Sequence, residues 1–245
     1  MGNRIRKYQQ KCYWKYLEAI GINYRYIFPE GNSIRPLPPV QTAIGGLMVI
    51  GAYPSARFER RKNSKNQYRI IPIGNNLHPF AKETYFDGVS TRVLESGNRI
   101  REYLFDPLGI EPENCWITDL VKVFLYKKEH KHSVGDIFPK FKVPVLRNRF
   151  EALGKKSLDW IMEEIQIGKP KLILTLGEEV ARVVSGKRMS ATKLLTTELN
   201  YPERLGNKPS MFLPHPDGCR RSTKWRNVLK KQLAVIKRFL KNHSE

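Results

Sequence analysis

Residues 171–180 read KLILTLGEEV, a short apolar run that ends in glycine and is followed at once by two acids. An uninterrupted apolar run of this length is typical of a strand buried in a parallel sheet. Acids in the first turn of a helix interact favourably with the helix dipole. The stretch therefore predicts a buried strand over 171–176 that leads directly into a helix.

Three other apolar runs have the same character, and segments with helical periodicity separate them. The runs cover residues 47–50, 115–118 and 210–213, and the helices are expected near 3–20, 89–105, 146–166 and 222–241. Strands that alternate with helices predict an α/β fold, here three α/β/α layers around a central, mostly parallel four-stranded sheet. Ligands of such sheets bind beyond the carboxyl ends of the strands, which here are followed by 51–55, 119–122 and 215–221.

Two polar segments are longer than ordinary connections. Residues 56–87 are rich in Arg, Lys and Asn, and residues 126–144 are basic with two prolines. Loops of such length in a compact domain are usually functional or mobile, so we predict long excursions at both places. Together with a basic N-terminal segment over 1–40, which holds the helix near 3–20, they are expected to belong to one domain spanning 1–245.

The charge of the chain is strongly positive. Forty-four Lys and Arg residues oppose 23 acids, which gives a net charge of +21. Such a charge attracts polyanions, so DNA is the expected partner. An anionic membrane is the alternative, but a basic amphipathic helix with a wide aromatic face is not evident. We expect a monomer.

Composition also excludes several classes of protein. The three cysteines are far apart and form no CxxC pair, which argues against a disulfide framework, a zinc site or an iron–sulfur cluster. We therefore expect no metal and no cofactor. There is no N-terminal apolar region and no apolar run near about 18 residues, so neither a signal peptide nor a membrane span is predicted, and a cytoplasmic location is expected.

Several short motifs resemble uracil-DNA glycosylases. They are GAYPS at 51–55, YFDG at 85–88, ITDLVK at 117–122, PKLILTLG at 170–177 and HPD at 215–217. In this order they cover about residues 45–240, and they are most similar to family 4 enzymes, although the iron–sulfur cysteines are missing. The resemblance implies the same α/β/α fold and an enzyme that excises a flipped-out base by hydrolysing its N-glycosidic bond.

The resemblance also implies roles for individual residues. His215 is expected to donate a hydrogen bond to O2 of the base as negative charge develops, and Phe86 is expected to stack on the base. The other expected base-binding residues are Gly51, Ala52, Tyr53, Ser55 and Asp119. The expected contacts to DNA phosphates are Ser55, Arg57, Lys122, Arg220, Arg221 and Lys224; the last three lie near the start of the final helix, which favours anions.

One departure from the family concerns water activation. Family enzymes place an acid or Asn at the second or third position of the first motif, where this chain has Ala52 and Tyr53. We predict Asp87 as the catalytic carboxylate instead, since it lies in the motif of Phe86. The alternative for Asp87 is a cap of the following helix.

A second departure concerns the base. Asp119 replaces the family's base-reading Asn, and a carboxylate offers only acceptors, which suits the 4-amino group of cytosine. The alternatives are that Asp119 turns away to Lys122 or is protonated. Ser55 replaces the bulky Tyr that blocks C5 in the most familiar enzymes, although family 4 enzymes also have a small residue there.

These features predict a DNA glycosylase for a C5-modified cytosine, such as the hydroxymethyl or glucosylated form in some phage DNA. Such an enzyme would serve antiphage defence. Two alternatives stay open: a uracil-DNA glycosylase of base-excision repair, and a catalytically inactive DNA-binding module of the same fold.

Overall fold

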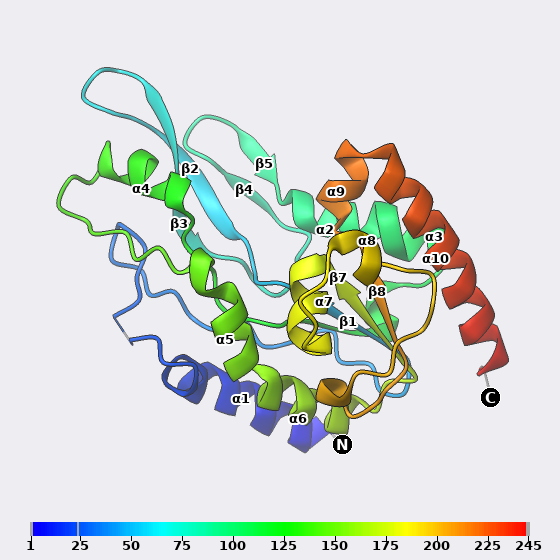
Figure 1. The fold of residues 1–245 in the computed structure, drawn as a ribbon. Helices are drawn as coiled ribbons and strands as arrows, with labels where there is room; N and C mark the ends of the chain where they lie inside the picture. Colours follow the sequence, from blue (N-terminus) through cyan, green and yellow to red (C-terminus); the bar gives the residue numbers. More distant parts are fainter. Residues whose placement is uncertain (1, 24, 244–245) are drawn as a thin grey trace.

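A four-stranded parallel sheet lies at the centre of the computed structural model, which describes residues 2–23 and 25–243 (Figure 1). Residues 1, 24, 244 and 245 of the expected domain lie outside the described residues. The strands, in the order β6-β1-β7-β8, are β6 (Cys115–Asp119), β1 (Leu47–Gly51), β7 (Leu172–Leu176) and β8 (Ser210–Leu213). All three pairings are parallel, which confirms the predicted sheet.

Alternate side chains of each strand enter two separate cores. In β1, Met48 and Ile50 pack into one cluster, while Leu47 and Val49 pack into the other. Helices α1 (Gly2–Ala19), α5 (Phe150–Lys156), α6 (Leu158–Gly168) and α7 (Glu178–Ser185) contribute to the first cluster. Helices α2 (Glu95–Ile100), α3 (Asp106–Leu108) and α10 (Thr223–Asn242) contribute to the second. The result is the expected three-layer α/β/α arrangement.

The two long terminal helices agree with their sequence patterns. Helix α1 buries Tyr8, Cys12 and Tyr16, which are spaced by four residues and share one face. Helix α10 buries Leu229 and Ile236. Within residues 2–23 and 25–243, no helix is both long and apolar enough to cross a membrane.

The polar segment 56–87 is not the long loop that we predicted. It holds the hairpin β2 (Ala56–Lys62) and β3 (Tyr68–Asn75), followed by the first strand of a second hairpin, β4 (Thr84–Phe86) and β5 (Thr91–Val93). Asn63 fixes the first turn, because its side chain accepts the backbone N–H groups of Lys65 and Gln67. Most β2 residues are only half-buried, so the alternation of apolar and polar residues that marks a strand is weak.

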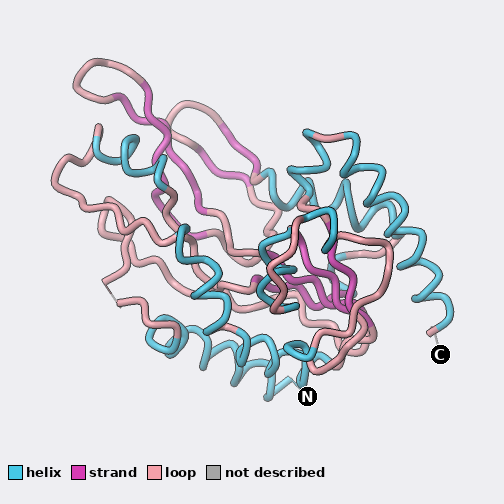
Figure 2. Tube along the Cα trace, in the orientation of Figure 1, coloured by secondary structure: helices cyan, strands magenta, loops and turns pink. Residues whose placement is uncertain are grey.

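Other boundaries also differ from the predictions. The helix expected from residue 89 begins at Glu95, because residues 91–93 pair with β4 instead. The helix expected near 146–166 is divided at Ser157 into α5 and α6. Segment 126–144 contains the short helix α4 (Lys128–Gly135), and two other short helices are α8 (Ala191–Leu194) and α9 (Pro216–Arg221). Figure 2 shows the magenta strands of the sheet enclosed by cyan helices, with the hairpins extending to one side.

Candidate functional site

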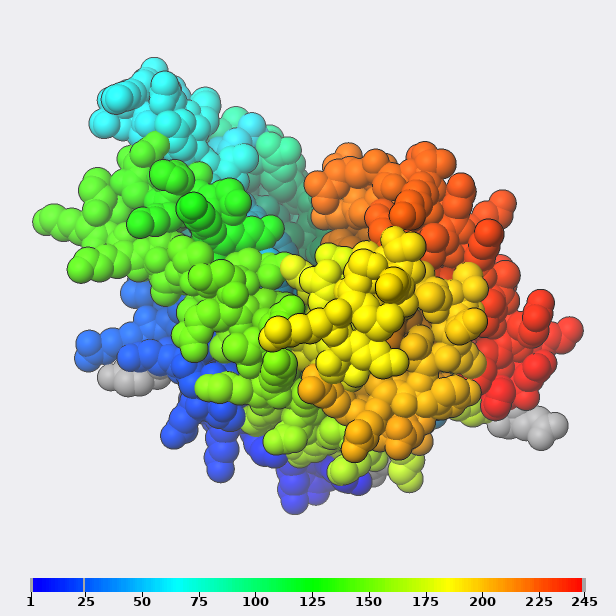
Figure 3. Space-filling model, in the orientation of Figure 1, coloured from blue at the N-terminus to red at the C-terminus, as the bar shows by residue number. Residues whose placement is uncertain are grey.

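A cavity of about 1110 Å³ opens at the carboxyl edge of the sheet. In the space-filling view the molecule is hollowed between the hairpins β2–β5 and the segment that carries α9 (Figure 3). The predicted site residues in its wall are Ala52, Tyr53, Ser55, Asp87, Asp119, His215 and Arg221. The fold therefore brings together residues that lie far apart in the sequence.

Asp119 and Phe80 belong to the wall of this cavity, and Gly51 lies directly against both of them. The sheet register places Gly51 directly opposite Asp119, the last residues of β1 and β6. A Cβ atom on Gly51 would lie 2.2 Å from Asp119 Oδ1 and 2.6 Å from Phe80 Cζ. Only glycine leaves room for this approach of a carboxyl group and an aromatic ring.

The Asp119 carboxyl group is buried, and its Oδ2 has no hydrogen-bond partner among the described residues. The residue is 1% exposed. The pKa of Asp119 is raised to about 7, chiefly by burial; the Lys122 charge opposes this rise and the Glu164 charge adds to it. The carboxyl group is thus close to half protonated at neutral pH, and its unsatisfied oxygen marks a place for a polar ligand.

Lys122 does not contact DNA phosphates, and that prediction was wrong. Its side chain is fully buried and forms an ion pair with Glu164 of α6. Its Nζ also donates to Thr118 Oγ1 (2.7 Å) and to the main-chain oxygen of Asp119 (3.0 Å). Lys122 thus holds the backbone of Asp119 in place, and its hydrogen bond to Asp119 is to the main chain and not to the carboxyl group.

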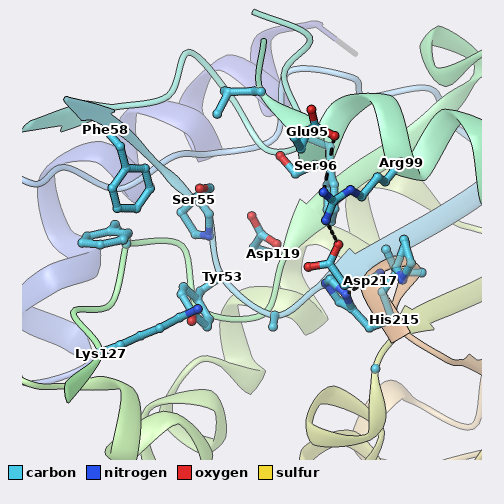
Figure 4. A pocket seen from close by; sticks show the side chains of 18 of the residues that line it. Tyr53, Ser55, Phe58, Glu95, Ser96, Arg99, Asp119, Lys127, His215 and Asp217 are labelled. Carbon is cyan, nitrogen blue, oxygen red and sulfur yellow. Dashed lines mark hydrogen bonds and ion pairs between the residues drawn. The ribbon is translucent and has the colours of Figure 1, made fainter. Parts of the chain in front are cut away.

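His215 begins helix α9 and faces the same cavity. Its Nδ1 accepts the backbone N–H of Asp217 (3.2 Å), so in the neutral ring the proton lies on Nε2. Desolvation by the surrounding residues lowers the pKa of His215, although the residue keeps exposed surface, and the Asp217 carboxylate opposes that shift only in part. The ring is therefore a neutral donor at pH 7. Asp217 is itself held by Arg99 of α2, as the dashed lines in Figure 4 show.

Phe86 lies outside the cavity wall and is 65% exposed on β4. The aromatic ring beside Asp119 is Phe80, which sequence analysis missed. Phe80 has a positive φ of 51°, a backbone conformation that costs energy in a residue other than glycine and often marks functional sites. The sequence held no distinct signal for Phe80, because segment 56–87 also contains the apolar run 70–73 and other aromatic residues.

Asp87 lines the cavity but is fully engaged. Its carboxylate accepts hydrogen bonds from Arg60, Arg92 and the backbone N–H groups of Val89 and Ser90. Burial acts to raise the pKa of Asp87, but these hydrogen bonds lower it well below its ordinary value. These contacts hold the β4–β5 turn and make Asp87 a weak base; the alternative of a helix cap is not met, because strand β5 follows this turn and the next helix begins at Glu95.

Tyr53 occupies the position where an acid was expected. Its hydroxyl accepts a hydrogen bond from Arg147 Nε (3.0 Å), and the Arg147 guanidinium lies over the Tyr53 ring at 5.2 Å. Burial raises the pKa of Tyr53, so the phenol stays neutral. Arg147 also pairs with Glu179 at the start of α7. Tyr53 therefore builds the cavity wall and offers no carboxylate to a water molecule.

The other basic residues that were predicted to contact DNA phosphates lie at two places in the fold. Arg57 on β2 pairs with Glu83 (2.9 Å) and stays partly exposed. Arg220 and Arg221 lie on α9. Lys224 on α10 donates to Thr192 Oγ1 (3.3 Å). Arg221 reaches the cavity wall, so the α9–α10 region forms a basic margin beside His215.

Comparison with known proteins agrees with the motifs and with the fold. A family model described as "Uracil DNA glycosylase superfamily" matches residues 45–240, which include the whole sheet and every residue of the cavity wall. A search of curated proteins found none that matches the chain. The range matched by the family model covers most of the chain.

Proposed function

Because this chain belongs to the uracil DNA glycosylase superfamily, we propose that it excises from DNA a cytosine that carries a substituent at C5. The observation that carries the proposal is Asp119, a buried carboxyl group with an unpartnered oxygen in the wall of the cavity. His215, a neutral donor across the same cavity, supplies the second half of the site.

The reaction needs stabilisation of a departing base. The target nucleotide is flipped out of the duplex, and its base stacks on Phe80 above Gly51. As the bond between C1′ and N1 breaks, its electron pair passes to the base, and Nε2–H of His215 donates to the negatively charged O2. The oxygen of a water molecule then bonds to C1′, and the proton that this water loses neutralises the departed base anion, which leaves an abasic site and the free base.

Asp119 is proposed to select the base by contacting the substituent at position 4 of the pyrimidine ring. Its carboxylate accepts from the 4-amino group of cytosine, while it repels O4 of uracil, which is also an acceptor. When protonated, the same group donates to N3 and still accepts from the 4-amino group. Ser55 in the cavity wall is small and leaves space beside C5.

A substituted cytosine is the consistent target. An enzyme that removed ordinary cytosine would damage the DNA of its own cell. Hydroxymethylated or glucosylated cytosine in phage DNA differs from host cytosine only at C5. We therefore propose a role in antiphage defence.

Water activation does not depend on a carboxylate in the first motif. Asp87, which we predicted for this step, is neutralised by Arg60 and Arg92. We propose that Asp87 stabilises the β4–β5 turn. Most of the rate enhancement is proposed to come from stabilisation of the departing base by His215.

The basic margin of α9 is proposed to bind DNA phosphates. Replacing Arg220 with Ala is expected to weaken DNA binding equally for all sequences and to reduce the slope of log Kd against log salt by about 1, as for the loss of one phosphate contact. Fluorescence anisotropy between 50 and 200 mM salt (roughly the range in which such slopes are read) measures both. Lys241→Ala, at the far end of α10, is the matched control. Equal slopes for both variants would exclude this contact.

A panel of duplexes tests the proposed activity. Each contains one uracil, cytosine, 5-hydroxymethylcytosine or glucosylated 5-hydroxymethylcytosine, and strand cleavage at abasic sites is the readout. We expect cleavage of the modified cytosines and none of ordinary cytosine. Release of uracil alone would instead support a repair enzyme. Binding without any release would support an inactive module, which the absence of an acid at Ala52 and Tyr53 favours.

A further inference from the structure

The cavity extends well beyond the residues that would hold a base. It is larger than the roughly 300–1,000 Å³ that suffice for a drug-sized ligand, and a pyrimidine is much smaller than such a ligand. The additional wall is formed by Phe58 of β2, by Phe124, and by His130 of α4, which together we call the aromatic subsite. The rings of Phe124 and His130 stack at 5.6 Å, and Phe58 lies 6.2 Å from Phe124 and 5.7 Å from His130.

The cavity extends in the direction in which a substituent on C5 of a bound pyrimidine would project. C2 and C5 are opposite atoms of the ring, so a base with O2 at His215 projects its C5 substituent away from His215. In Figure 4, His215 lies at one side, Asp119 lies in the middle, and Ser55 and Phe58 lie at the other side. A substituent on C5 therefore points past Ser55 toward Phe58.

The lining of the subsite fits an uncharged sugar ring. The half-buried rings of Phe58 and His130 offer apolar surface to the C–H face of a sugar, while the buried Phe124 ring supports them, and polar side chains at the margin bond to the sugar hydroxyls. Arg60 and Lys127 line the cavity beside the rings. His130 Nδ1 accepts the backbone N–H of Lys127 (3.1 Å), and burial lowers the pKa of His130 to about 4, so its ring is a neutral donor through Nε2.

From this geometry we infer that the aromatic subsite binds a hexose attached at C5 of the target base. The inference rests on the proposed function and names the substituent that the enzyme recognises. Phe58 and His130 come from segments 56–87 and 126–144, the two excursions that interrupt the succession of sheet strands and helices. The subsite gives these segments a specificity role.

Binding measured without turnover tests the subsite. Duplexes that carry 5-hydroxymethylcytosine or its glucosylated form are titrated by fluorescence anisotropy against the His215→Ala protein, in which base release is slow. We expect tighter binding of the glucosylated duplex. Adding Phe58→Ala is expected to reduce that preference about 10-fold, through loss of an aromatic contact and its buried area. Phe58→Leu, which keeps apolar volume, is expected to lie between them.

The control and the outcomes separate this inference from the activity. Tyr201→Ala removes an exposed aromatic ring outside the cavity wall and is expected to keep the full preference. Equal affinity of the His215→Ala protein for both duplexes, or an unchanged preference after Phe58→Ala, would overturn the subsite. Absence of abasic sites with the unmodified protein would overturn the proposed activity alone, because the binding preference is measured independently.

Discussion

Replacement of His215 with Ala is expected to slow base release about 100- to 1000-fold, the usual effect of removing one donor to a developing anion. The surroundings of His215 favour one protonation state of its ring, the neutral state that the proposed hydrogen bond to the departing base requires. Its Nδ1 accepts the backbone N–H of Asp217, and desolvation lowers its pKa, so the neutral ring in the cavity wall carries its proton on Nε2. A neutral donor stabilises the departing base without first binding a proton from solvent.

Single-turnover cleavage of the preferred duplex measures this loss. His243→Ala removes a histidine that stacks on Phe239 at the end of α10 and serves as the matched control, with no change expected. DNA affinity of the His215→Ala protein is expected to stay within a few fold, because phosphate contacts dominate affinity. A rate close to that of the unmodified protein would show that another group carries the negative charge.

The central sheet could be predicted because its signal is local. Four short apolar runs that end at turns identify buried strands, and the helices between them require parallel pairing. The hairpin β2–β3 could not be recognised in the same way. A two-stranded ribbon buries little of either face, so its residues, including Arg60 and Arg61, are mostly half-buried. The sequence of β2 therefore lacks the alternation of apolar and polar residues that marks a strand.

The site was predictable only where motifs mark it. His215 and Asp119 lie at the ends of strands, and their positions in the cavity follow from sheet topology. Lys122 follows β6 just as closely, yet it turns inward to Glu164, which lies much later in the sequence. Pairing over such distances depends on the packing of α6 against β6, which no local pattern contains. Phe80 was missed because its place beside Gly51 depends on the path of a loop.

Replacement of Asp119 with Asn is expected to shift the ratio of release rates toward uracil by about 10-fold or more. One good polar contact to a base contributes about 1–3 kcal/mol to discrimination, which corresponds to a change of this size. An amide supplies a donor to O4 of uracil, which the carboxylate cannot. The release rates of both bases by the unmodified protein are also expected to fall as pH rises through 7, since deprotonation removes the Asp119 donor that reaches N3 of cytosine or O4 of uracil. The variant is expected to lack that pH dependence.

The readouts are the release rates for modified cytosine and for uracil, measured from about pH 6 to about pH 8 on either side of the Asp119 pKa, and the ratio of these rates. Asp159→Asn, at the start of α6, changes a carboxylate to an amide away from the cavity and is the control. If the ratio and the pH dependence of the rates are the same in all three proteins, then Asp119 does not contact the base.

The same substitution has a consequence for stability, and its sign follows from proton binding. The pKa of Asp119 is about 7 in the folded protein and 3.8 in an ordinary environment, so between these values the folded state binds more protons than the unfolded state. The free energy of unfolding therefore falls as pH rises through this window, by up to about 4 kcal/mol, and levels off above about pH 7. The Asp119→Asn variant has no group that titrates at this position. Urea denaturation is therefore expected to show the variant gaining stability relative to the unmodified protein between about pH 4 and about pH 7.

Parallel curves for the two proteins would mean that Asp119 is ionised in the cavity at little cost. A relative gain in the variant would show that the fold keeps this carboxyl group at the expense of stability. Such a cost is expected for a residue whose role is recognition, because sites that bind a ligand hold polar groups that the empty protein leaves without partners. We propose that a bound base supplies the hydrogen bond that this carboxyl group lacks in the empty protein, where Oδ2 has no donor among the described residues.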